Sequence, residues 1–217
     1  MGELFNLDNK FFQIIGKGVD CAALSMLWLI CCIPLVTAGA ATSALYYAVN
    51  KVIRHGRGYI WSEYWHAFRV NFKQSTLAWL IIFAVQVLML VDSYVMYQFA
   101  RAGEKSGVLY IVFLIFFVLI AVWSGYVFAY IARFENSLRR VLKNSAFMAI
   151  ANMRWTLVII VLYVATLLIL YIVPPFIVIF PAVYTLILNH IIEKIFRKYM
   201  TEEDAAAEDE RNREYFN

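Results

Sequence analysis

Asp92 is the one carboxylate placed deep inside an apolar segment of this sequence. A carboxylate at that depth can relay protons or bind a cation, and acids inside membrane segments are functional candidates by default. Insertion scales place its cost at about 2.5 to 3.5 kcal/mol, whereas the twelve Leu, Ile, Val and Phe residues of 77–99 contribute roughly −4 to −7 kcal/mol together. The segment therefore tolerates Asp92 without a partner. A transport or proton-relay role and a polar anchor packed against Tyr110 both stay open.

Other chemistry-bearing residues give no catalytic pattern. Asn189 and His190 lie at the end of the last predicted span, just before Glu193 and Lys194. They can form an acid–base pair or simply belong to a solvated helix end, and we expect the helix end. The sequence contains no serine–histidine set, H-E-x-x-H, G-x-S-x-G or phosphate-binding loop. We therefore expect no catalytic residue and no enzyme activity.

Cysteine and histidine spacing predicts neither a disulfide framework nor a metal site. The three cysteines, Cys21, Cys31 and Cys32, all lie in one apolar segment. The three histidines, His55, His66 and His190, have no partner at ligand spacing. No metal, cofactor-binding residue or cofactor is expected.

The composition places the chain in a membrane. Of its 217 residues, 63% are hydrophobic and 16% are charged, whereas soluble domains average about 45–50% and about 25%. The apolar residues form blocks of span length with the charges between them. The net charge of +4 is therefore interpreted loop by loop, and nucleic acid is not an expected partner.

Five membrane spans are predicted within a single domain of residues 1–200, followed by a polar, acidic cytoplasmic tail at 201–217. Four spans cover about 75–99, 107–132, 155–173 and 176–192, with a kink expected at Pro181. The opening region, 19–54, is the fifth, with its span at about 21–48. As one straight helix this region would reach ~54 Å, far beyond a ~30 Å hydrocarbon core, so the first helix must be broken.

Lysine and arginine counts set the orientation. The segments 51–73, 133–154 and 193–217 hold five each, whereas 100–106 holds two and the Pro174-Pro175 turn none. Basic loops face the cytoplasm. This places the C-terminus inside and, if the first region crosses once, the N-terminus outside.

The break is predicted at Pro34 and the following run of small residues. Ala38-Gly39-Ala40 resembles a signal-peptide cleavage site, but cleavage would leave the basic segment 51–73 on the outer side. A retained, tightly packed kink is favoured over a re-entrant functional element. Thr37, Thr42 and Ser43 can cap the backbone groups released there.

Two cytoplasmic surface helices are predicted, at about 60–73 and 136–152, each with an apolar stripe opposite basic residues. Each precedes a hairpin of spans, which suggests a repeat of about 80 residues. The exposed faces supply the candidate docking residues, namely Arg69, Asn71, Phe72, Lys73, Arg139, Arg140 and Lys143.

The stretch LWLICCIPLVTAGAATSALYY (27–47), with KVIR (51–54) and NFKQ (71–74), resembles the YesL-like family of bacterial multi-pass membrane proteins. The residues of this motif at the helix break are Pro34, Thr37, Gly39, Ala40, Ala41, Thr42, Tyr46 and Tyr47. The resemblance implies a place in the bacterial plasma membrane and genes that lie beside carbohydrate ABC-type importers and polysaccharide-degrading enzymes. The family has no established catalytic residues to transfer.

The leading functional hypothesis is a non-enzymatic accessory membrane protein associated with a carbohydrate ABC-type import system or polysaccharide-utilisation machinery. Its expected partners are the lipid bilayer and an ABC transporter permease or another membrane subunit. A small channel or transporter and a purely structural membrane module remain alternatives.

Overall fold

The computed structural model describes residues 10–200, which are mostly helical and contain no strand. The acidic tail at 201–217 lies outside the described residues. In chain order, the longer helices are α1 (Lys10–Cys32), α2 (Ala38–Ala48), the π-helix η3 (Val49–Arg54), α3 (Ile60–Arg101), α4 (Leu109–Arg133), α5 (Leu138–Ala151), α6 (Met153–Ile172) and α7 (Phe180–Tyr199). Three short 3-10 helices connect them: η2 (Leu35–Thr37), η4 (Lys105–Val108) and η5 (Pro174–Val178).

Four helical segments within the described chain are long and apolar enough to cross a membrane. They are Ile15–Cys32, Ile60–Arg101, Lys105–Arg133 and Met153–Ile172. This confirms the predicted all-helical class with segments apolar enough to span a membrane, and it gives four such segments where the sequence predicted five.

The fifth predicted span, 176–192, is not among these four segments. Residues 174–178 form η5, and α7 begins at Phe180 and carries Glu193, Lys194 and further charges in its second half. Pro181 lies in the first turn of α7, where its missing N–H breaks no helical hydrogen bond. The predicted kink at Pro181 was therefore wrong.

The opening region is broken at the predicted place, between α1 and α2. Helix α1 ends at Cys32 and the Thr37 hydroxyl donates to the carbonyls of Cys31 (2.5 Å) and Pro34 (2.8 Å). The chain then folds back, and the Trp28 indole N–H donates to the Thr42 hydroxyl at 3.1 Å. With 11 residues, about 17 Å, α2 is too short to span a bilayer alone. Helix α2 continues directly into η3, and the opening region is thus a pair of helices packed against each other.

The predicted surface helix 60–73 is not a separate element. It is the first part of α3, a continuous helix of 42 residues, which is about 63 Å long. Neither glycine nor proline occurs between residues 60 and 101, so nothing ends the helix at the polar residues 73–76. Ser75 there is buried and donates to the Ser43 hydroxyl at 2.9 Å.

Helix α5 is a separate element, close to the predicted bounds of 136–152. Val141, Met148 and Ala149 are buried, whereas Phe147 and Ile150 are exposed. Asn152, with φ −114° and ψ 46°, separates α5 from α6. Because the first unit of the suspected repeat has no such interruption, the two units differ in structure.

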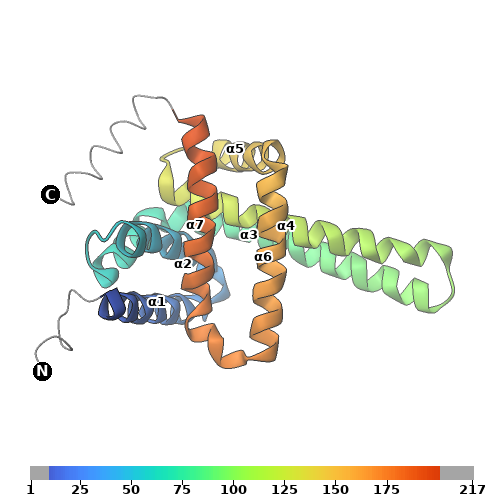
Figure 1. Cartoon of the computed structure of the whole chain (residues 1–217). Coiled ribbons are helices and arrows are strands. Elements are labelled where there is room, and N and C mark those ends of the chain that lie inside the picture. Colours follow the sequence, from blue (N-terminus) through green and yellow to red (C-terminus); the bar gives the residue numbers. More distant parts are fainter. Residues whose placement is uncertain (1–9, 201–217) are drawn as a thin grey trace, which may run out of the picture.

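The second half of α3 and the first half of α4 form a hairpin that projects from the other helices (Figure 1). Within the described chain, no residue of α3 after Ile82 and none of α4 before Val122 is buried. Ser93 donates to the Tyr110 carbonyl at 3.1 Å, and the rings of Tyr97 and Tyr110 pack edge to face. The two helices therefore contact each other and leave their other faces uncovered.

Helix α2 lies at the centre of the remaining helices and contacts α1, α3, α4 and α7. Its inner residues are small and fully buried: Ala40, Ala41, Ala44 and Ala48 are 0% exposed. Such residues allow helix backbones to approach closely. The motif that contains the break is thus the packing centre of the fold.

Ser25 joins α1 to the start of α7. It is 0% exposed; its hydroxyl donates to the Ile179 carbonyl (3.1 Å) and accepts from the Ala182 N–H (3.0 Å). The Ala182 N–H has no partner inside its own helix because it lies in the first turn. A side chain distant in sequence therefore caps α7.

Ser25→Ala is expected to lower the free energy of unfolding by about 1–3 kcal/mol, because it leaves the buried Ala182 N–H without an acceptor. The measurement is thermal unfolding in detergent. Ser106→Ala, at an exposed serine of η4, is the control. Equal midpoints for the two variants would contradict this capping role.

Candidate functional site

Six polar residues, including Glu193 of α7, lie together near the C-terminal end of α2. The Glu193 cluster consists of Tyr46, Asn50, Arg54, Arg133, Asn189 and Glu193, which come from α2, η3, α4 and α7. Glu193 is 4% exposed and Asn189 is 0% exposed. Buried ionisable groups in membrane proteins are functional candidates, so this cluster is the strongest site in the described chain.

Glu193 is the acceptor at the centre of the cluster. Its Oε1 accepts from the Tyr46 hydroxyl at 3.2 Å and from the Asn50 amide at 3.0 Å. Its Oε2 lies 3.4 Å from Nε of Arg133. Burying a carboxylate is expensive unless it is paired and hydrogen-bonded, and both conditions are met here.

Asn189 connects the cluster to the backbone of two helices. Its side-chain amide donates to the backbone carbonyls of Thr185 (3.1 Å) and Tyr46 (3.4 Å), and its backbone carbonyl accepts from the Arg54 guanidinium at 3.3 Å. Two acceptors, Asn50 Oδ1 and Asn189 Oδ1, are buried without a hydrogen-bond donor among the described residues. Buried polar atoms are usually paired, so these oxygens can receive a donor from a bound molecule.

The π-helix η3 supplies Asn50 and Arg54 to the cluster. A π-helical turn is a rare distortion that occurs frequently at functional sites. The His55 ring contacts the Asn50 carbonyl at 2.7 Å through Nδ1. Among the described residues, no group of three His, Cys, Asp or Glu could hold a metal ion. The cluster joins four elements, α2, η3, α4 and α7.

The expectation of a solvated helix end at Asn189 was wrong. Sequence reasoning grouped Glu193 with the charged residues that follow it, but α7 continues to Tyr199. Asn189 and Glu193 are four residues apart and share a helix face with the buried Ile192 and Phe196. That spacing was the signal that could have found the site. His190 is exposed, outside the cluster.

Lys51 and Glu63 fix the turn between η3 and α3. Lys51 Nζ lies 2.7 Å from Glu63 Oε2 and 3.3 Å from the Tyr47 hydroxyl. Burial alone would lower the pKa of Lys51, but the hydrogen bonds to Glu63 and Tyr47 outweigh it and raise that pKa. A Cβ at Gly58, where φ is +77°, would clash with Glu63. The basic segment after α2 is therefore held against α3.

All five candidate docking cations are exposed: Arg69 and Lys73 on α3, and Arg139, Arg140 and Lys143 on α5; Asn71 is half-buried and Phe72 is exposed. The Gln74 amide donates to the Asn136 carbonyl at 2.5 Å. This bond joins the two basic segments just before α5 begins.

The structure places Asp92 apart from the Glu193 cluster, on the projecting hairpin, where it is half-buried. The neighbouring Ser93 bonds to the Tyr110 backbone, and Tyr97 packs on the Tyr110 ring. In the described part of the chain, Asp92 has neither a hydrogen bond nor an ion pair.

Residues 21–93 match the model of a family described as a protein of unknown function, DUF624. This match covers about a third of the chain: the break, α2, η3 and much of α3. Searches of curated proteins and of solved structures found no match. The chain is thus similar, in its opening third, to an uncharacterised family, and that match includes Tyr46, Asn50 and Arg54 of the Glu193 cluster.

Proposed function

We propose that the protein is a non-enzymatic accessory subunit that binds another integral membrane protein through the α3–α4 hairpin. The observation that carries this proposal is the projection of a long apolar hairpin away from the other helices (Figure 1). Residues 83–101 alone span about 28 Å, close to the ~30 Å hydrocarbon core. Such a hairpin offers a partner helix an extended contact surface.

Asp92 adds chemical specificity to this surface. Acidic side chains in membrane segments nearly always face a partner or water, and Asp92 has no ion pair within the described chain. A cationic or hydrogen-bonding side chain of the partner would satisfy it. We therefore assign Asp92 to the contact rather than to ion transport.

The orientation that fits this function places both ends of the α1–α2 hairpin in the cytoplasm. Asp20 and Ala23, in the first half of the candidate span Ile15–Cys32, line one groove together with Val52 and Tyr59, so this half of the span lies nearest the basic segment. If that segment is cytoplasmic, the span begins on the cytoplasmic side too. This replaces the outside N-terminus expected from a single crossing.

The partner we propose is a carbohydrate ABC-type import system in the bacterial plasma membrane. The support is the YesL-like resemblance of residues 27–47 and the exposed cations of α3 and α5, which suit docking to a cytoplasmic subunit. The sequence has no phosphate-binding loop, so any energised transport would use the partner's nucleotide site.

Affinity purification from the native host in mild detergent tests the proposal. We expect the wild type to retain a transporter subunit, and Asp92→Asn to recover several-fold less of it because the charge is lost at the contact. Glu104→Gln, at an exposed glutamate of the hairpin tip, should behave as wild type. If the wild type never recovers a membrane partner, the proposal is wrong.

A second candidate, a small transporter, is favoured by the two buried oxygens without donors beside Glu193. Such a site can bind a polar solute that carries N–H or O–H groups. Uptake of labelled sugars into vesicles that contain the purified protein tests it. Uptake that Glu193→Gln abolishes would support transport. No uptake, together with no co-purified partner, would leave a purely structural membrane module.

A further inference from the structure

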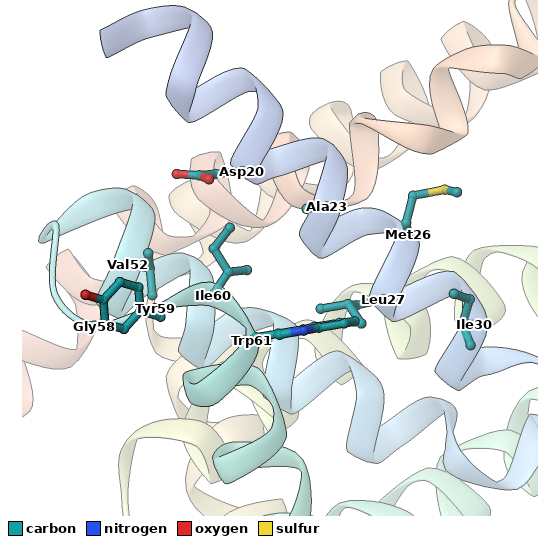
Figure 2. Close-up of a pocket in the computed structure, with 10 residues that line it drawn as sticks. All are labelled: Asp20, Ala23, Met26, Leu27, Ile30, Val52, Gly58, Tyr59, Ile60 and Trp61. Carbon is teal, nitrogen blue, oxygen red and sulfur yellow. The ribbon is translucent and has the colours of Figure 1, made fainter. Parts of the chain in front are cut away.

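An apolar groove lies between α1 and the start of α3. It has a volume of about 650 Å³, within the range of ligand pockets. Figure 2 shows Met26, Leu27 and Ile30 of α1 lying across from Ile60 and Trp61 of α3. Met26 and Ile30 are 46% and 59% exposed. The groove therefore opens along the outer face of α1.

A second hollow of about 680 Å³ adjoins the groove and shares Tyr59 and Trp61 with it. It also contains His66 and Arg69, which are both exposed. In the described chain neither side chain has a hydrogen bond or ion pair, whereas Lys51 nearby is paired with Glu63. The groove is thus apolar and the hollow beside it is cationic.

We propose that the groove and the hollow together bind one anionic phospholipid of the bilayer. An acyl chain lies in the groove along α1, and the headgroup phosphate lies in the hollow, where Arg69 and His66 can donate hydrogen bonds. The α1 wall lies in the candidate membrane span Ile15–Cys32, so an acyl chain can enter the groove along α1.

One further feature places the headgroup. Tyr59 and Trp61 are 83% and 63% exposed at the boundary between the two parts, as is typical of aromatic side chains at the membrane–water interface. Arg69 lies on the side of the hollow at this boundary, so the headgroup lies there.

Native mass spectrometry of the delipidated full chain tests this site. The probes are phosphatidylglycerol and phosphatidylcholine with identical acyl chains. We expect one phosphatidylglycerol to bind more tightly than phosphatidylcholine, and Arg69→Gln to weaken phosphatidylglycerol binding by about fivefold, the effect of one basic residue near an anionic headgroup. Arg69→Gln should leave phosphatidylcholine binding unchanged.

Matched variants separate a site from general lipid adhesion. Arg140→Gln, at an exposed arginine of α5, removes the same charge away from the groove and should bind phosphatidylglycerol as wild type. Met26→Trp fills the groove from a half-exposed position and should weaken both lipids, with its unfolding midpoint recorded to verify folding. Excess inorganic phosphate should not displace the lipid. Equal losses from Arg69→Gln and Arg140→Gln, or displacement by phosphate, would overturn the proposal.

Discussion

Glu193→Ala is expected to lower the free energy of unfolding by about 3 kcal/mol, the range measured when one partner of a buried ion pair is removed. The substitution leaves Arg133, whose side chain is 23% exposed, without its carboxylate. It also removes the acceptor of Tyr46 and Asn50. Because these residues come from different helices, α2, η3, α4 and α7 would lose a shared contact. Thermal unfolding in detergent measures the effect.

Two control variants identify the cause of that loss. Glu135→Ala removes an exposed glutamate close to α5 and should change stability by less than about 0.5 kcal/mol. Glu193→Gln keeps an acceptor for Tyr46 and Asn50 but loses the charge, so it should fall between wild type and Glu193→Ala. Equal unfolding midpoints for Glu193→Ala and Glu135→Ala would contradict a buried, paired carboxylate.

Gly39→Leu is expected to destabilise the fold by about 3 kcal/mol or more, through overpacking at the centre of the helices. Even a single Cβ at Gly39 would clash with the Ser75 carbonyl oxygen and would lie 2.5 Å from Trp79 Cβ. Both are close to the α3 backbone, which cannot move aside as a flexible side chain can. Helices α2 and α3 would have to separate.

Thiol-reactive dye can report this unfolding, because Cys21 and Cys31 are buried in α1 and react when the helices separate. Gly39→Ala should show a smaller shift in the same direction. Gly18→Ala is the matched control, since a Cβ there meets nothing within 4 Å. It should be neutral or stabilising by up to about 1 kcal/mol, the gain in helix propensity. An unfolding midpoint for Gly39→Leu at or above that of Gly18→Ala would refute the close approach.

The break in the opening region could be predicted because proline and small residues act locally. Pro34 cannot continue a helix, and Thr37 provides a hydroxyl for the carbonyls that the break releases. The fold-back that follows could not be predicted. It depends on contacts between helices, such as Trp28 with Thr42, that no local pattern encodes.

Polar residues inside apolar segments misled the interpretation in two places. Lys73 and Gln74 suggested a helix boundary, yet α3 continues because Ser75 is bonded inside the fold to Ser43. Glu193 resembled the start of a charged tail, yet it is buried and paired. In both cases the environment of the polar group was decided by a helix distant in sequence.

The direction in which the α3–α4 hairpin projects likewise could not be predicted from the sequence. Residues 83–101 and 109–121 expose large apolar side chains along much of their length, which predicts contact with lipid or protein without choosing between them. From the sequence, a contact between Asp92 and Tyr110 was one possibility. In the structure, the Ser93 hydroxyl donates a hydrogen bond to the Tyr110 carbonyl instead. Only the arrangement of the other helices leaves the hairpin uncovered.

Site-specific photocrosslinking in native membranes tests the docking hairpin most directly. A photoreactive phenylalanine analogue replaces Tyr94 on α3 (64% exposed) or, as the control, Tyr171 on α6 (86% exposed). We predict that the probe at position 94 forms a covalent adduct with another membrane protein and that the probe at position 171 does not. Adducts with lipid alone at position 94, or the same protein adducts at both positions, would contradict an accessory subunit that docks through this hairpin.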